Sequence, residues 1–251
     1  MLELSRKKRE LLQREELILD VTRDLLLELG YHGLTMDRIA EAMEYSKGTI
    51  YQHFPCKEEV LAEVGTRLFR TRLEMFKRAA AFNGRTRERI VAIGEAGELF
   101  VRLHPDDFRL LHIIKAEIIA RKVSEKRLRK MKDSEYAVLF LMNGIIREAI
   151  QDGDLDPACG KSIEEMSFGL WAVTDGGYGN IVRGMPLDEI GIKDPFRSVI
   201  SVCEILGDGY GWRPLTSEWN YDATRERIRA TLFAEETRTL ARRTPRESTA
   251  G

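Results

Sequence analysis

Two short helical patterns separated by only three residues are the feature of this sequence that most constrains its fold. Residues 36–43 and residues 47–53 each repeat apolar side chains with the period of a helix. Thr35 and Ser46 stand directly before them, where a helix needs an N-cap. Helices this short contribute little stability on their own, so longer neighbours must supply the packing. The pattern predicts a helix-turn-helix arrangement.

Nearly all of the remaining chain also has a helical period, and no segment alternates convincingly as a half-buried strand does. The first helix is expected to bury one stripe of Ile18, Val21, Leu25 and Leu29, and to end at Gly30 and Gly33. Further helices are predicted at 57–82, 86–103, 106–122, 125–152, 162–183, 194–208 and 222–243. We therefore predict an all-α protein with two domains, residues 1–60 and residues 61–251.

Composition narrows the classes of protein that this chain can belong to. It has 251 residues, of which 43% are apolar, and a net charge of −1. The longest apolar run, YAVLFLM, is far shorter than the roughly 20 residues of a membrane-spanning helix, and the N-terminus lacks the apolar segment of a secretory signal. Three cysteines without a CxxC pair fit a reducing compartment. We expect a cytoplasmic protein without a membrane partner.

The residue patterns of metal sites and enzymes are missing from the sequence. The four histidines and three cysteines show no ligand spacing, and neither a GxSxG motif nor a dinucleotide fingerprint occurs. We expect no metal, no cofactor and no catalysis. Cys56 leaves two readings open, because His53 and Lys57 nearby would lower its pKa and make it a redox sensor, whereas a small residue in a turn needs no function.

The second short helix has the chemistry of a surface that binds nucleic acid. It offers Lys47, Thr49, Gln52 and His53 as outward-facing side chains and contains no acidic residue. A single helix fits the major groove of DNA, which is about 12 Å wide. The first 60 residues carry nine Lys and Arg against twelve Asp and Glu. This excess of acidic residues opposes DNA binding in general. Salt, however, screens the repulsion between exposed charges that lie more than about 10 Å apart.

Residues 18–61 resemble the tetracycline-repressor (TetR) family of bacterial transcriptional regulators. The resemblance rests on an aromatic-x-Gly at Tyr31 and Gly33, on Thr35 before Ile39-Ala40, on the run Ser46-x-Gly-Thr-Ile-Tyr51, and on His53-Phe54 followed by Lys57-Glu58. It implies a three-helix DNA-binding domain, followed by a larger helical domain for ligand binding and dimerisation.

The resemblance also implies the roles of individual residues. Tyr51, Lys57 and Thr35 would contact phosphates, Lys47 and Thr49 would approach base edges, and Gly48 would allow a close backbone approach. The expected DNA-binding residues are Thr35, Tyr45, Ser46, Lys47, Gly48, Thr49, Tyr51, Gln52, His53 and Lys57.

The junction departs from the family pattern at two positions. Glu44 stands where the family usually has Gly, and Tyr45 stands where it usually has a small aliphatic residue. If the turn requires a positive φ at residue 44, Glu costs about 1 kcal/mol relative to Gly. Its carboxylate would also repel phosphate. Tyr45 either reaches the DNA or covers the turn.

The larger region is expected to enclose a ligand cavity between its helices. The candidate wall residues are Phe100, Phe108, His112, Phe140, Asn143, Trp171, Asp175 and Tyr178. Gly176, Gly177 and Gly179 favour either close helix packing at a dimer interface or a kink beside a pocket. By resemblance, helices 162–183 and 194–208 would pair two chains.

The sequence therefore predicts a homodimeric regulator, released from a palindromic double-stranded DNA operator by a small molecule and acting as a repressor. The alternative is a helical small-molecule-binding protein whose N-terminal module does not bind DNA. Glu44 and the acidic balance of the first 60 residues are what favour that alternative.

Overall fold

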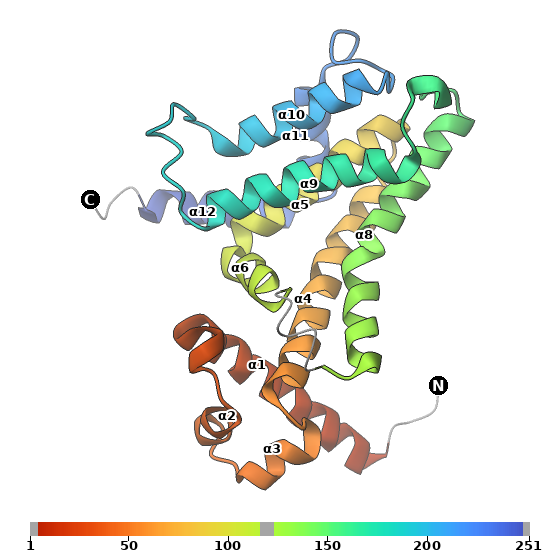
Figure 1. Ribbon diagram of the computed structural model, residues 1–251. Coiled ribbons are helices and arrows are strands. Elements are labelled where there is room, and N and C mark those ends of the chain that lie inside the picture. Colours follow the sequence, from red (N-terminus) through yellow and green to blue (C-terminus); the bar gives the residue numbers. More distant parts are fainter. Residues whose placement is uncertain (1–4, 116–122, 248–251) are drawn as a thin grey trace. The chain divides into compact units, whose positions relative to one another are not determined.

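The chain is built from helices, as the sequence predicts (Figure 1). The structure is a computed structural model that describes residues 5–115 and 123–247, and within these ranges helices are the regular elements. None of the helices in the described ranges has the length and apolarity to cross a membrane. The helices are α1 (Arg6–Gly33), α2 (Met36–Ala42), α3 (Lys47–His53), α4 (Lys57–Ala80), α5 (Thr86–Leu103), α6 (Pro105–Ile114), α8 (Glu125–Gln151), η1 (Pro157–Cys159), α9 (Ile163–Val182), α10 (Pro195–Gly209), α11 (Tyr221–Thr231) and α12 (Ala234–Glu247).

These helices form two compact units. The first unit comprises residues 1–70 and 110–135, and the second comprises residues 71–109 and 136–251. The predicted boundary at residue 60 does not coincide with the division between these units, and the functional division that it describes stays a prediction.

The first unit contains the helix-turn-helix, and both predicted N-caps are confirmed. The Thr35 side chain accepts a hydrogen bond from the backbone N–H of Arg38, and Ser46 Oγ accepts one from Thr49, each at 3.2 Å. These bonds satisfy N–H groups that the first turn of a helix leaves without a partner. Ile39 of α2 and Ile50 of α3 are fully buried, so the two helices share one core.

The turn between α2 and α3 has the positive φ that the family pattern requires. Glu44 has φ 56°. The N–H of Tyr45 donates to Ala40 O at 2.9 Å, and the N–H of Glu44 donates to Glu41 O at 3.0 Å. This pair of bonds is the Schellman motif, whose left-handed position is usually glycine. The turn therefore keeps its shape although it carries glutamate, at a cost of about 1 kcal/mol.

The buried stripe of α1 differs from the predicted one. Ile18 is buried as expected, but it is followed by Thr22 and Leu26, while Val21 and Leu25 are only half-buried. Both the predicted and the observed stripe have the spacing of three or four residues that places side chains on one face of a helix. A stripe traced through apolar residues missed this face because its central member is the polar Thr22.

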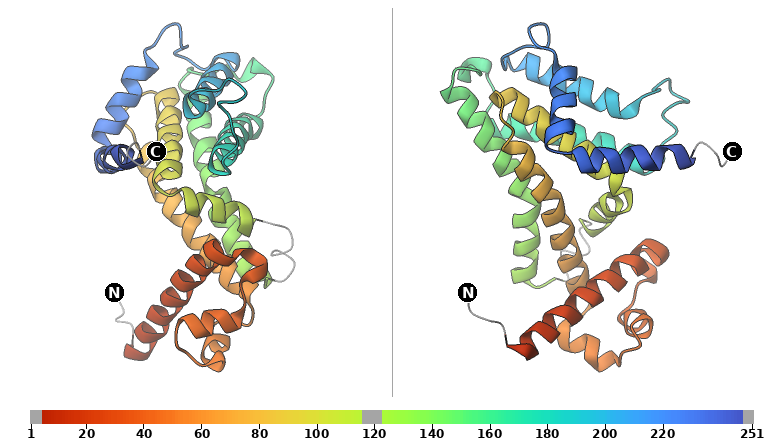
Figure 2. Two further views of the ribbon diagram at one scale, coloured as in Figure 1. Left: turned by 90° about the vertical axis from the view of Figure 1, so that its left-hand side faces the viewer. Right: turned by 180° about the vertical axis from the view of Figure 1, so that it is seen from behind.

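The second unit is organised around α5. Helices α9, α10, α11 and α12 all pack against it, and α9 also packs along α10 (Figure 2). A Cβ added at Gly177 would lie 2.4 Å from Cγ2 of Val199. Gly177 is therefore needed for the close approach of α9 and α10 within one chain. A Cβ at Gly176 would meet nothing within 4 Å.

The predicted helix 222–243 is two helices, so that prediction is wrong. α11 ends at Thr231, α12 begins at Ala234, and Phe233 between them is fully buried. The sequence contains no glycine or proline at this break. The break turns the chain so that both helices lie against α5. The predicted helix 106–122 is observed as α6, and its part at 116–122 lies outside the described residues.

Candidate nucleic-acid interface and ligand cavity

One face of α3 is exposed and carries polar side chains. Lys47, Gly48, Tyr51 and Gln52 are exposed, and Thr49 is half-buried. The opposite side buries Ile50 in the core. Ser46 Oγ lies 2.8 Å from Thr49 Oγ1, which ties the cap to the first turn of the helix. The exposed face therefore presents one cation, one phenol, one amide and a bare stretch of backbone, all suited to phosphates and base edges.

His53 does not belong to this face, and the prediction that it points outward is wrong. Its side chain is only 2% exposed, and Nδ1 lies 3.4 Å from Oε1 of Glu15 on α1. His53 follows Ile50 by three residues, so both lie on the side of α3 that packs inward.

Lys47 is exposed but has a partner. Its ammonium donates to Oδ2 of Asp37 at 2.6 Å, and this hydrogen bond raises the pKa of Lys47. Both side chains are more than half exposed, so solvent screens the pair and it contributes little to stability. A phosphate can therefore replace Asp37 at little cost.

Gly48 is not required by the packing of the chain itself. A Cβ at this position would meet only Ser46 Oγ, at an ordinary contact distance of 3.8 Å. Glycine within a helix is less stable than alanine by about 0.5–1 kcal/mol. The exposed site and the absence of a packing reason fit a surface that another molecule approaches closely.

Lys57 holds the end of α1. Its ammonium donates to Tyr31 O at 2.7 Å and to Leu34 O at 2.9 Å, and it lies 4.1 Å from the centre of the Tyr31 ring. An ammonium has three N–H groups, so one remains for the predicted phosphate contact. Lys57 is therefore a structural residue as well as a candidate DNA contact.

Three other residues of the predicted interface lie at the ends of α2 and α3. Thr35 and Ser46 are exposed and act as N-caps. Tyr45 is exposed, and the guanidinium of Arg14 lies 5.8 Å from the centre of its ring. Covering the turn and contacting DNA are both compatible with this position.

Cys56 lacks the lowered pKa that a redox sensor needs. Burial is the largest influence and raises the pKa of its thiol, and Glu58 raises it further. Of the two readings that the sequence left open, the raised pKa therefore favours a small residue in a turn over a redox sensor. A thiol that stays protonated is a poor nucleophile.

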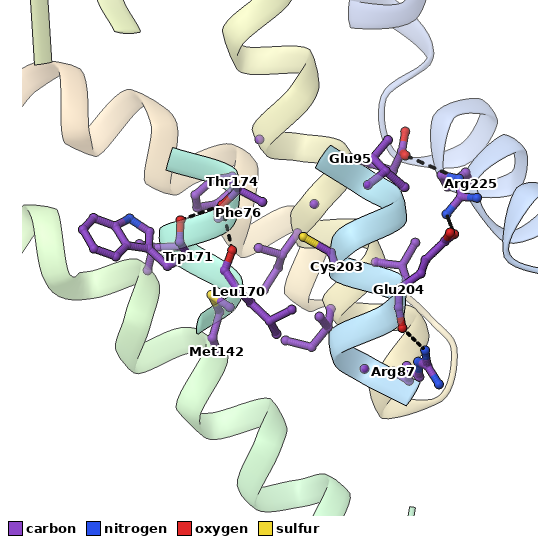
Figure 3. A pocket seen from close by; sticks show the side chains of 18 of the residues that line it. Phe76, Arg87, Glu95, Met142, Leu170, Trp171, Thr174, Cys203, Glu204 and Arg225 are labelled. Atoms are coloured by element: carbon purple, nitrogen blue, oxygen red, sulfur yellow. Dashed lines mark hydrogen bonds and ion pairs between the residues drawn. The ribbon is translucent and has the colours of Figure 1, made fainter. Parts of the chain in front are cut away.

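A cavity of about 90 Å³ lies within the second unit (Figure 3). Its walls come from α4, α5, α8, α9, α10 and α11. Figure 3 shows Phe76 of α4, Met142 of α8 and Leu170 of α9 among them, with Cys203 of α10 on another side. Most of the lining is apolar.

The charged residues in the wall are paired with one another or with residues behind them. Arg87 lies 2.7 Å from Asp208 and also donates to the carbonyl oxygens of Trp212 and Pro214. Arg225 and Glu204 are 2.7 Å apart.

Glu95 is the most deeply buried of these charges. Its Oε2 lies 2.5 Å from Nε of Arg229, and the residue is 2% exposed. Burial raises the pKa of Glu95, and Arg229 opposes that shift.

Two of the predicted ligand residues line the cavity. Trp171 and Tyr178 of α9 are both part of the wall. Asp175 lies behind the wall, 3.8 Å from Arg72, which does line it.

The other five predicted ligand residues do not line this cavity. Phe100 and Phe108 are fully buried core residues, and Phe140 of α8 is 69% exposed. His112 and Asn143 are half-buried. Helical spacing places an aromatic residue on a helix but does not tell which neighbour it faces.

The prediction missed several wall residues. Trp212, Tyr221 and Arg225 come from the C-terminal part of the chain, and Arg87 comes from the first turn of α5. Trp212 is only 1% exposed. A tryptophan beside the glycines of GDGYGW was the one local signal of a buried site here.

Several known proteins are similar in sequence to this chain. Residues 18–64 match the sequence pattern of the bacterial regulatory proteins of the tetR family. An uncharacterized HTH-type transcriptional regulator of Bacillus subtilis, YhgD, is 28% identical over 150 residues, covering 58% of this chain and 74% of the relative. The fatty acid metabolism regulator protein of B. subtilis is 25% identical over 175 residues, covering 64% and 84%.

Solved structures of such regulators share the fold. The transcriptional regulator FadR from B. subtilis, in complex with stearoyl-CoA, superimposes with a TM-score of 0.60 at 18% identity, covering 77% of this chain and 98% of that one. The exposed face of α3, its capped turn and these likenesses agree: residues 18–64 form a DNA-binding domain of the tetR-family type, in a transcriptional regulator that shares the fold of the solved proteins.

Proposed function

We propose that this protein is a homodimeric repressor that a small molecule releases from a palindromic operator. The observation that carries the proposal is the exposed face of α3, which is formed by Lys47, Gly48, Tyr51 and Gln52. The N-cap at Ser46 stabilises this short helix. Two such helices would enter successive major grooves about one helical turn apart. As a regulator of transcription, the protein would work in the cytoplasm.

Exposed apolar side chains on α9 and α10 support the dimer. Phe168, Val202 and Ile205 are 57%, 43% and 67% exposed. These three large apolar side chains lie on two helices that pack side by side. Their exposure to water is unfavourable. A second copy of the same two helices would cover them, as the family resemblance implies.

The cavity of the second unit supports a ligand-responsive mechanism. A ligand changes DNA affinity only if it binds one conformation of the dimer more tightly than the other. One relative is named for fatty acid metabolism, and one structural neighbour holds stearoyl-CoA. However, this cavity of about 90 Å³ is smaller than the about 150 Å³ that accommodates benzene, so it holds at most a short group unless its walls move.

A gel-shift titration with the DNA upstream of the protein's own gene tests the DNA-binding function. We expect nanomolar-scale binding that weakens steeply with salt, because each neutralised phosphate adds about −0.9 to the slope of log K against log salt. Tyr51→Phe should weaken binding without changing the melting temperature, because Tyr51 is exposed. Binding that is absent, or that does not respond to salt, would favour the non-DNA-binding alternative.

Light scattering tests the dimer. Ile205→Lys should convert the dimer to a monomer, because it places a charge in the proposed interface. Ile190→Lys is the matched control, since Ile190 is 63% exposed but lies outside α9 and α10. A dimer that survives Ile205→Lys would place the interface elsewhere.

A further inference from the structure

Two tyrosines line the cavity, and their hydroxyl groups differ. The Tyr221 hydroxyl donates to Pro214 O at 2.5 Å. The Tyr178 hydroxyl has no hydrogen-bond partner among the described residues, although the residue is only 1% exposed. A buried hydroxyl without a partner is unfavourable, so it requires an explanation.

The surroundings of Tyr178 keep it neutral and rigid. Its ring packs against Phe196, with 5.5 Å between centroids, and a Cβ at Gly97 would lie 3.9 Å from its Cε2. Burial and the nearby Glu98 raise the pKa of Tyr178, so it stays protonated. A protonated phenol donates a hydrogen bond to an acceptor.

The charges around the cavity oppose an ionic ligand. Each charged wall residue has an ion partner: Arg72 has Asp175, Arg87 has Asp208, Arg225 has Glu204 and Glu95 has Arg229. A carboxylate entering the cavity would either remain unpaired or break one of these pairs. Both outcomes are costly in a buried site.

We propose that the cavity binds an uncharged, largely apolar group that carries one hydrogen-bond acceptor, such as a ketone or ester carbonyl, and that Tyr178 donates to this acceptor. The proposal rests on the ligand-responsive function proposed above and specifies its ligand class. The small volume limits the buried part to about four non-hydrogen atoms, in proportion to benzene in about 150 Å³.

Three probes of equal size test the ligand class on the wild-type protein. Propanone, acetate and 2-methylpropane each have four non-hydrogen atoms in the same branched arrangement, and they differ in carrying an uncharged carbonyl, a charge or neither. In a ligand-observed NMR titration without DNA, we expect the ketone, propanone, to bind at least about tenfold more tightly than the charged probe, acetate. If acetate binds as tightly as the ketone, or if none of the probes binds, the assigned ligand class is wrong.

Two variants test the role of Tyr178. Tyr178→Phe should weaken propanone binding about fivefold and leave 2-methylpropane binding unaffected, because only the ketone uses the hydroxyl. The melting temperature without ligand should not fall, because the removed hydroxyl has no protein partner. Tyr31→Phe is the control outside the cavity: it removes a hydroxyl that donates to Glu58 at 2.8 Å, so the melting temperature should fall while the ketone affinity is unchanged. Equal ketone affinity in wild type and Tyr178→Phe would overturn the assignment.

DNA binding is measured separately on the same samples. If the operator is bound and no probe binds, the ligand class is wrong while the DNA-binding function stands. If the ketone binds and no DNA does, the regulatory function is wrong while the ligand class stands.

Discussion

The α3 surface and the cavity use the same kinds of charged residue in opposite surroundings. At α3, Lys47 and Asp37 form an ion pair whose side chains are 65% and 57% exposed. Beside the cavity, Arg225 and Glu95 have side chains only 8% and 1% exposed. Exposed ion pairs exchange partners easily, because water solvates the separated charges. Breaking a buried pair is costly, because it leaves a buried charge with neither a partner nor water. The first arrangement suits a surface that must accept phosphates, and the second suits a wall that must keep its shape.

Arg225→Ala should have the largest effect. Its loss leaves Glu204 and Glu95 without this cation in a buried site, and we expect the free energy of unfolding to fall by about 3–5 kcal/mol in urea titrations. Arg213→Ala removes an arginine from an exposed pair with Glu218 and should leave the free energy of unfolding nearly unchanged. Similar losses in both variants would contradict the distinction between the two surroundings.

Lys57→Ala should have an intermediate effect, because this lysine combines both roles. We expect a loss of about 1.5–3 kcal/mol, since two charged hydrogen bonds to the end of α1 disappear, together with weaker DNA binding. Lys47→Ala is the matched control and should weaken DNA binding with an unchanged melting temperature. An unaltered free energy of unfolding in Lys57→Ala would show that its two carbonyl contacts are unimportant.

Glu44→Gly should stabilise the protein by about 1 kcal/mol, because it relieves the positive φ. It should also tighten DNA binding, because it removes a negative charge from the turn. Glu44→Gln separates the two effects, since it removes the charge and keeps the strain. Thermal unfolding measures the effect on stability, and gel shifts measure the effect on DNA binding. If Glu44→Gln is as stable as Glu44→Gly, the strain is not the cause.

Gly48→Ala should have the smallest effect on stability, a gain of about 0.5–1 kcal/mol. DNA binding should nevertheless weaken, because the added methyl group blocks close approach to the backbone. Gly144→Ala on α8 is the control, since a Cβ there also meets nothing within 4 Å. It should give a similar gain and leave DNA binding unchanged. Undiminished DNA binding in Gly48→Ala would place the duplex away from this face.

Sequence patterns predict local structure well, but they predict poorly which residues distant in the chain come into contact. The caps at Thr35 and Ser46 and the strained turn at Glu44 all depend on hydrogen bonds between residues at most five apart. The orientation of His53 depends instead on Glu15, 38 residues away in the chain. A seven-residue helix has too few positions for its apolar pattern to tell which polar residue lies at the border of the buried side.

The cavity shows the same limit more strongly. Trp171 and Tyr178 were predicted because aromatic residues on a helix often line pockets, but the same reasoning selected Phe140, which is exposed. Arg87 was missed because its role comes from the carbonyl of Trp212, 125 residues later. Nothing local to either residue records that contact.

The sequence by itself determined most of the helices, the caps at Thr35 and Ser46, the helix-turn-helix and most of the polar face of α3, because each of these follows from interactions within about one helical turn. Only the tertiary structure decided that Lys57 holds the end of α1, that the buried charges pair across helices, and that the Tyr178 hydroxyl is left without a partner. Those outcomes depend on which distant residues are brought into contact. Burial then gives these contacts most of their energetic weight, because water no longer competes for the polar groups.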